Sequence, residues 1–292
     1  MMSPPAKSWS LRGRANFRSA EAGAVDALSA RREWLQLAEA IERHGGVVAV
    51  LPPDDALTGL PYAAEAGHVL PGAPPRFVLP RMWAEHRRGE RDRWAPFVRA
   101  LGFEVVELDG GIWEAQGDVA LFDSATLLFF GGRTDRAGLA AAMSHFDGEV
   151  IVLELRQPAF HGNMAVLPLP AVDKLLVCPD VILGDGVDRL LDRFGRDRVV
   201  PVAEDEIRSY ATNGLPVGKA WLSPSVVPPR VVDLVRGFGM EVELLDMREL
   251  CEKAGGASRC LVCVAPGVAD LVRLDAAVRL PATREAILGD SA

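Results

Sequence analysis

The sequence lacks the features that mark several large classes of protein. Four cysteines in 292 residues are too few for the disulfide framework of a small secreted domain. No apolar run approaches the roughly 20 residues that cross a membrane. The first segment, MMSPPAKSWSLRGRANFR, carries positive charge but lacks the apolar stretch of a secretory signal. We therefore expect a soluble protein of a reducing compartment, the cytoplasm.

An excess of positive charge is also missing. The net charge is −8 and the isoelectric point is near 5.3. Binding to phosphate groups requires a cationic face, so we expect neither a nucleic acid nor an acidic membrane as partner. Hydrophobic residues make up 49% of the chain, which is enough to bury a large core. A small molecule is the partner that this composition favours.

Motifs that hold cofactors are absent as well. The chain has no Gly-x-Gly-x-x-Gly after a strand, no phosphate loop and no Gly-x-Ser-x-Gly elbow, so we expect no nucleotide cofactor and no serine hydrolase. Cys260 and Cys263 form a Cys-x-x-Cys, but no second Cys/His pair has the spacing of a zinc site. We expect no metal and no other cofactor.

The segment around this cysteine pair, GGASRCLVCV, reads as a glycine turn followed by a β-strand. A redox pair of the thioredoxin type would stand at the start of a helix instead. Positions three apart in a strand point to opposite faces, so the two cysteines are not expected to act as a pair. Cys263 then fills the core, and Cys260, directly after the Gly255–Gly256 turn, is free to serve a site.

What the sequence does contain is a repeat. A helical segment that ends at glycine and runs into a β-rich segment occurs five times, in ARREWLQLAEAIERHGGVVAVLPP, RDRWAPFVRALGFEVVELDGG, RAGLAAAMSHFDGEVIVLEL, DGVDRLLDRFGRDRVVPVAE and PPRVVDLVRGFGMEVELLDM. In the first, Trp34, Leu37, Ala38 and Ile41 have helical spacing. Pairs of short β-like runs, such as HVLPGAPPRFVLP and DVALFDSATLLFFGG, separate these units. The module is strand, strand, helix, strand, and it recurs about every 40 to 55 residues.

The repeat predicts the fold class. Each module has an apolar sheet face that only its neighbours can cover, so five modules should close into a ring, a five-bladed pseudo-symmetric α/β propeller. We expect residues 1–24 to form an N-terminal arm and residues 25–292 a single catalytic domain. In a closed ring, the segments at one mouth of the axis converge on one concave site.

Polar residues recur at one place in these modules, next to the strand pair between helices. They are Glu65, Glu114, Asp118, Arg133, His161, Asn213 and Cys260. Each has an ordinary interpretation: a small core thiol, a structural histidine, solvated turn acids, or the start of a helix. Taken together, a thiol, a base and a carboxylate are the parts of a nucleophilic triad, which lie apart in sequence and meet in the fold.

Several segments resemble the guanidino-modifying, or pentein, superfamily, which includes arginine deiminases, dimethylarginine dimethylaminohydrolases and arginine:glycine-type amidinotransferases. The most specific are WEAQGDVALF, FFGGRTDRAG, ELRQPAFHGNMAVLP, ATNGLPVG and LCEKAGGASRCLVCV. The family fold is a fivefold α/β propeller of the module described above. By this resemblance Cys260 is the nucleophile, His161 the general acid/base, and Glu114 the carboxylate that orients it.

The resemblance also implies a substrate site. It places Glu65 where the family holds the guanidinium, and Arg133 where a substrate carboxylate is gripped. We expect Asp118, Asn163 and Asn213 to complete this site. Two positions depart from the family pattern: the usual His-x-Asp segment reads HGN, so Asn163 replaces an acid, and Glu65 is one methylene longer than aspartate. These changes favour a substituted guanidine, a ureido group or another amine-bearing substrate over plain arginine deimination.

The activity that follows is that of a cysteine-dependent hydrolase. It would act on the guanidino or ureido group of an arginine-like small molecule through an amidino group held on sulfur. If an amine rather than water accepts that group, the same Cys-His-Glu site makes an amidinotransferase. A ligand-binding protein without turnover is a further alternative on the same fold. A homodimer is also compatible with the sequence.

Overall fold

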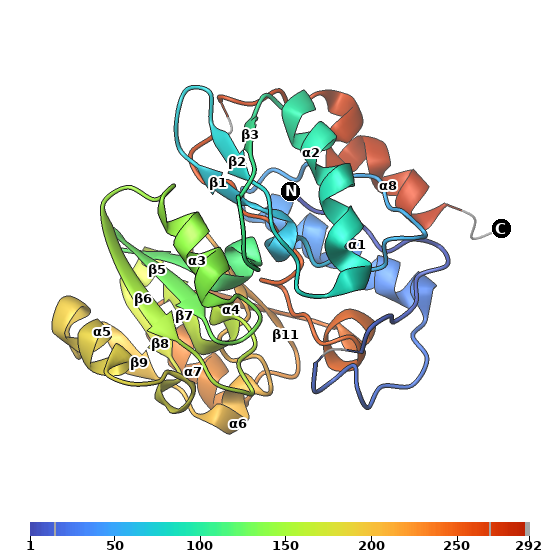
Figure 1. Cartoon of the computed structure of the whole chain (residues 1–292). Helices are drawn as coiled ribbons and strands as arrows, with labels where there is room; N and C mark the ends of the chain where they lie inside the picture. Colours follow the sequence, from blue (N-terminus) through green and yellow to red (C-terminus); the bar gives the residue numbers. More distant parts are fainter. Residues whose placement is uncertain (15, 269, 290–292) are drawn as a thin grey trace.

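The computed structural model describes residues 1–14, 16–268 and 270–289 of the chain (Figure 1). Its α-helices are α1 (Ala27–Arg43), α2 (Arg91–Ala100), α3 (Arg136–Met143), α4 (Gly162–Ala165), α5 (Gly186–Phe194), α6 (Glu204–Ile207), α7 (Pro229–Gly237) and α8 (Leu280–Leu288). Its strands are β1 (His68–Leu70), β2 (Arg76–Val78), β3 (Glu104–Val106), β4 (Val119–Phe122), β5 (Ala125–Phe130), β6 (Glu149–Glu154), β7 (Val166–Leu169), β8 (Lys174–Val177), β9 (Val199–Pro201), β10 (Leu215–Val217), β11 (Ala220–Pro224) and β12 (Glu241–Leu245). No helix in these ranges is both long and apolar enough to cross a membrane.

These strands form four small sheets of three strands each. The orders are β1-β2-β3, β4-β5-β6, β7-β8-β9 and β10-β11-β12. In every sheet the first two strands pair antiparallel as a hairpin, and the third returns parallel to the second after a helix, α2, α3, α5 or α7. The mixed α/β class and four of the strand-strand-helix-strand modules are thus confirmed.

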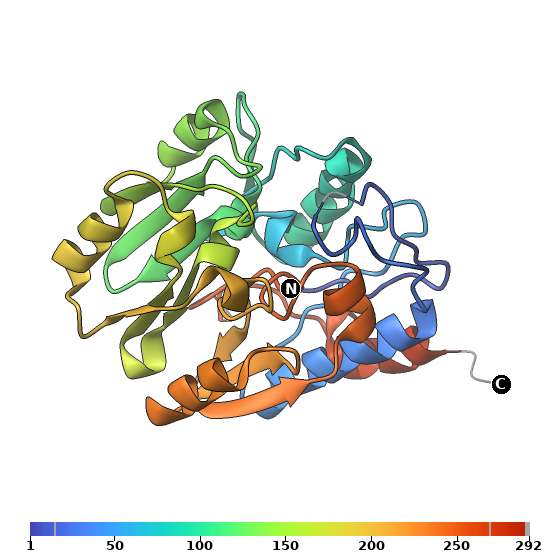
Figure 2. The ribbon, with the colours of Figure 1, turned by 90° about the horizontal axis from the view of Figure 1, so that it is seen from below.

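The first predicted unit has its helix but not its sheet. Helix α1 buries Trp34, Leu37, Ala38 and Ile41, as their spacing predicts. The following run contains only isolated bridges, because its pairing partners come from the two ends of the chain: Met2 with Val50, and Ala49 with Arg279. Helix α8, near the C-terminus, lies beside α1 (Figures 1 and 2).

The predicted strand around Cys260 and Cys263 is wrong. Residues 258–261 form a turn in which the Cys260 amide donates to the Ala257 carbonyl, and residues 262–264 after it form no strand. Met1 pairs with Cys263, by donating to its carbonyl over 2.8 Å and accepting from its amide over 3.0 Å. One such residue pair is too short to make a strand. Cys263 nevertheless fills the core, as predicted, with no exposed surface.

The modules place polar residues in the middle of the molecule. A short helical turn precedes the first strand of three sheets: η1 (Ala63–Ala66) before β1, η3 (Ala115–Asp118) before β4, and α4 before β7. Each turn is buried, and η1 and α4 both pack against η3. This arrangement brings side chains from separate modules to one place.

The apolar face of α1 should contribute strongly to stability. Trp34 is fully buried, so Trp34→Ala is expected to lower the free energy of unfolding by about 3–5 kcal/mol through lost burial and the cavity left behind. Arg32, on the exposed side of the same helix, provides the matched control. Arg32→Ala should change the free energy by less than about 0.5 kcal/mol. Denaturant unfolding of the two variants checks this, and equal effects would contradict the packing described.

Candidate active site

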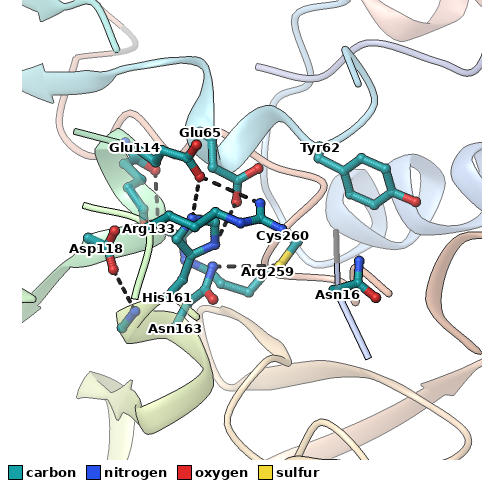
Figure 3. A network of polar contacts seen from close by, with 12 residues as sticks. Asn16, Tyr62, Glu65, Glu114, Asp118, Arg133, His161, Asn163, Arg259 and Cys260 are labelled. Atoms are coloured by element: carbon teal, nitrogen blue, oxygen red, sulfur yellow. Dashed lines mark hydrogen bonds and ion pairs between the residues drawn. The ribbon is translucent and has the colours of Figure 1, made fainter. Parts of the chain in front are cut away.

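Four of the predicted site residues line one pocket. Cys260, His161, Glu65 and Arg133 face it, together with Tyr62 and parts of the N-terminal segment (Figure 3). The cavity measures about 80 Å³. A single water needs roughly 10–15 Å³ on the same measure, so the cavity accepts a planar group of several heavy atoms.

His161, which lines this pocket, makes a short contact with Glu114 behind it. The Nε2 atom of His161 lies 2.6 Å from Oε2 of Glu114, and both side chains are essentially unexposed. The other carboxylate oxygen of Glu114 accepts the backbone amide of Trp83 over 2.9 Å. The histidine ring is thus oriented through Nε2, while its Nδ1 atom is buried and has no hydrogen-bond partner among the described residues. Nδ1 is the atom left to exchange a proton with a ligand.

Electrostatics favour a charged His161–Glu114 pair. Burial alone would raise the pKa of Glu114, but the hydrogen bond and charge of His161, with the charges of Arg133 and Arg87, lower it to about 2. Burial alone would lower the pKa of His161, yet the charges of Asp118, Glu114 and Glu65 and the hydrogen bond to Glu114 raise it. His161 is therefore poised to hold a proton near neutral pH and to give it up in a reaction.

Asp118 lies behind the histidine and does not line the pocket. One of its oxygens accepts the Gly162 amide over 2.8 Å, and the other accepts the Thr134 hydroxyl over 2.6 Å. The Thr134 oxygen also accepts the Glu114 amide over 3.1 Å. Burial raises the pKa of Asp118 to about 6 despite the opposing effect of His161 and these hydrogen bonds. Asp118 fixes the backbone on both sides of the His161–Glu114 contact.

Glu65 is held by an arginine that sequence reasoning missed. Arg87 donates to Oε2 of Glu65 over 2.7 Å and makes a two-point contact with Glu90, at 2.8 Å for both bonds. It also donates to the carbonyls of Gly59 and Tyr62. The remaining oxygen of Glu65, Oε1, lies 3.5 Å from Nδ1 of His161. Glu65 thus bridges a buried cation and the histidine.

Cys260 lies across the pocket from these carboxylates and is only 5% exposed. Burial, followed by the charge of Glu65, raises the pKa of its thiol to about 12, although Asn213 and Arg259 oppose this shift. The Asn163 amide nitrogen lies 3.6 Å from the sulfur, and Asn213 donates to the Asn163 carbonyl over 3.1 Å. Neither asparagine lines the pocket; both support the sulfur from behind, and the Oδ1 atom of each is buried without a hydrogen-bond partner among the described residues.

Arg133 reaches the pocket from the segment between β5 and α3. Its guanidinium lies over the Phe160 ring at 4.6 Å and over the Trp83 ring at 5.9 Å. One guanidinium nitrogen is 3.6 Å from Oε2 of Glu114. The side chain keeps 12% of its surface exposed, so it places a positive charge at the open side of the pocket.

The structure therefore brings together seven of the eight predicted site residues around Cys260 and His161, and places Asp118 one layer further back. Sequence reasoning missed Arg87, Glu90, Thr134 and Tyr62. None has a motif of its own, and only Arg87 and Glu90, three residues apart on one turn, offered a local signal. Within the described ranges, no group of three or more His, Cys, Asp or Glu side chains is arranged to hold a metal ion.

Comparison with known proteins finds a similar enzyme. No family model matches the chain. A dimethylarginine dimethylaminohydrolase of Mycobacterium tuberculosis is 25% identical over 236 residues, which cover 81% of this chain and 76% of that protein. The chain is thus similar to a guanidino-modifying enzyme of the pentein superfamily. The same superfamily was expected from the segments around Glu114, His161 and Cys260.

Solved pentein structures share the fold. The N-terminal domain of ArgZ, an arginine dihydrolase from the ornithine–ammonia cycle in cyanobacteria, was crystallised with its product. It superposes with a TM-score of 0.81 at 24% identity, over 89% of this chain and 94% of that domain. A dimethylarginine dimethylaminohydrolase carrying an adduct with S-methyl-L-thiocitrulline superposes with a TM-score of 0.67 at 21% identity, over 89% of this chain and 96% of the other.

The contact between His161 and Glu114 leads to a testable prediction. Glu114→Gln removes a negative charge from Nε2 of His161, so the pKa of His161 is expected to fall. NMR titration of the imidazole protons measures the change. Glu243→Gln is the matched control, because Glu243 contacts a different histidine, His44, over 2.8 Å. A His161 pKa that is the same in the Glu114→Gln variant and in the wild type would contradict the described electrostatics.

Proposed function

We propose that the protein is a cysteine-dependent hydrolase that acts on the guanidino or ureido group of an arginine-like small molecule. The observation that carries this proposal is that the Cys260 thiol and the Glu114-oriented His161 open onto one pocket with the carboxylate of Glu65. The similarity to a dimethylarginine dimethylaminohydrolase supports the same reaction class. In this site Cys260 is the nucleophile, His161 the general acid/base and Glu114 its orienting group.

Substrate binding would prepare the nucleophile. With a pKa raised to about 12, the Cys260 thiol is protonated at neutral pH in the empty site. A guanidinium that binds against Glu65 brings a positive charge close to the sulfur and offsets the charge of Glu65. Both effects favour the thiolate, whose proton leaves to solvent. The flat cation is then held with its carbon over the sulfur.

The chemical steps follow from the positions of Cys260 and His161. The thiolate forms a bond to the guanidinium carbon and gives a tetrahedral adduct. The imidazolium of His161 donates its Nδ1 proton to the departing amine as the C–N bond breaks, which leaves an amidino group on sulfur. Neutral His161 then takes a proton from water, and the resulting hydroxide adds to the amidino carbon. Collapse of this second adduct breaks the C–S bond; the hydroxyl proton passes to the departing sulfur, which releases a ureido product and restores the Cys260 thiol.

The second side chain expected to hold the substrate's guanidino group is neutral. Asn163 stands beside the sulfur where the family pattern has an acid, and its amide can accept an N–H without adding charge. Arg133 supplies positive charge at the open side, suited to a carboxylate on the substrate's tail. A substituted guanidine or a ureido group therefore suits this site better than plain arginine. Asp118 acts in this site by fixing the backbone around His161, and Asn213 acts by supporting the sulfur of Cys260. Neither residue touches the substrate.

The wider architecture belongs to the same proposal. The four sheets, with α1 and the chain ends as a fifth unit, would form a five-bladed ring around the site. Residues 25–292 would then be one catalytic domain. Residues 1–24 would be an arm across the pocket; Trp9, Arg12 and Asn16 among its lining residues support this role. The cytoplasmic location and the homodimer stay predictions.

Replacement of the nucleophile tests the function. Purified wild type is offered arginine, methylated arginines, agmatine, citrulline and small guanidines, while ammonia, amines and ureido products are measured. Cys260→Ala is expected to lower turnover by about 10⁴-fold or more, because the covalent route is lost. Cys178→Ala, which removes a buried thiol outside the pocket, should keep wild-type activity.

Acid quenching during turnover should trap the amidino group on the peptide that contains Cys260, as measured by mass spectrometry. Absence of turnover with every substrate, and of any adduct, would refute the hydrolase and leave a ligand-binding protein. Turnover that requires an added amine would replace hydrolysis by amidino transfer.

A further inference from the structure

Arg259, next to the nucleophile in the chain, is a partly buried cation whose side chain forms hydrogen bonds only with uncharged groups among the described residues. Its guanidinium donates to the Val262 carbonyl over 2.8 Å, to Oε1 of Gln116 over 3.1 Å and to the Gln116 carbonyl at 3.5 Å. It does not line the substrate pocket. Burial lowers the pKa of Arg259, while the nearby Cys263 and Cys260 sulfurs and the charge of Glu65 oppose that shift.

The contrast with Arg87 is informative. Arg87 is more deeply buried, and it contacts two carboxylates, Glu65 and Glu90. Arg259 has no such contact in the described part of the chain. A partly buried guanidinium that forms no ion pair loses hydration without a direct counter-charge, and the charge of Glu65, which is not in contact with it, offsets only part of that cost. Cys260, as a thiolate, is the anion that the proposed reaction creates next to this cation.

Gln116 holds Arg259 without neutralising it. The Gln116 side chain accepts the Val264 amide over 2.8 Å and donates to the Val264 carbonyl over 2.6 Å, and its oxygen also accepts from Arg259. Gln116 lies within η3, the short turn that begins directly after Glu114. It therefore connects the loop that carries Cys260 to the turn that orients His161. A glutamate here would reach the same guanidinium but would cancel its charge.

We propose that Arg259 and Gln116 are positioning residues of the nucleophile: Arg259 supplies a fixed positive charge beside Cys260, and Gln116 anchors that guanidinium through an uncharged oxygen. The inference rests on the proposed function only in taking Cys260 as the nucleophile. It assigns the stabilisation of the thiolate in part to the enzyme itself rather than to the substrate's cation alone. Arg259 opposes the upward shift that burial gives the thiol pKa.

Alkylation of Cys260 tests the charge directly, since thiolate is the form that displaces iodide from iodoacetamide. Rate constants are measured between pH 7 and 10 by peptide mass spectrometry, with Cys178 as the internal reference. Arg259→Gln is expected to slow Cys260 alkylation about tenfold at a given pH, equivalent to a rise of about one unit in the thiol pKa. Gln116→Glu should slow it similarly. Arg259→Lys, which keeps the charge, should remain within about threefold of wild type.

The controls separate charge from folding and from turnover. Arg156→Gln changes an arginine that is 44% exposed and should leave the rates unchanged. Circular dichroism and the unfolding midpoint establish that each variant is folded. A folded Arg259→Gln variant that alkylates at the wild-type rate overturns the proposal. An Arg259→Lys variant as slow as Arg259→Gln overturns the charge role, because loop geometry would then explain both.

Alkylation also requires no substrate. Failure of every guanidino substrate would therefore refute the proposed function and still leave the inference about Arg259 to be decided by these rates. Where turnover is found, Arg259→Gln is expected to lower kcat and to leave KM within about twofold, since Arg259 does not reach the substrate pocket. An increase in KM with unchanged kcat would contradict a positioning role at the sulfur.

Discussion

Compensation of buried charge is the constraint on which the centre of this protein depends. Glu65, Glu90, Glu114 and Asp118 are nearly or wholly removed from solvent. Each would be costly to bury alone, so each is matched by a cation or by backbone and hydroxyl donors. Arg87 serves two of them, His161 serves Glu114, and Asp118 takes a hydroxyl and an amide. Removal of one partner would therefore leave another charge unpaired.

The repeating module explains how these charges meet. Glu65, Glu114 and His161 each stand in or just before a short turn that leads into the first strand of a sheet. The strands themselves contribute no reactive side chain. Each strand fixes the position of the short turn that leads into it. Contacts between turns of different modules, such as Gly162 to Asp118, then set the geometry. A change in one module is therefore felt at the site through hydrogen bonds between modules rather than through the sheets.

The sequence predicted the parts of this design that are local or periodic. Helical spacing located α1, and alternation of hairpin and helix located the four sheets. The triad residues followed from chemistry and resemblance. The strand at Cys260 was predicted wrongly because an apolar run resembles a strand, while the actual partner of that run, Met1, lies 262 residues away and pairs with one residue only. Gln116 and Arg259 were missed for a similar reason: their contact spans 143 residues, and neither has a motif.

The pairing of Glu65 with Arg87 bears on how a cation would bind. Arg87 already occupies Oε2 of Glu65, so a substrate guanidinium in the proposed reaction meets Oε1, the oxygen that lies 3.5 Å from Nδ1 of His161. Substrate N–H groups and the imidazolium then compete for one oxygen. As the substrate takes that oxygen, the Nδ1 proton loses part of its electrostatic stabilisation, which makes it a stronger acid towards the departing amine. Arg87, although it does not touch the reacting atoms, would thus connect substrate binding to proton donation.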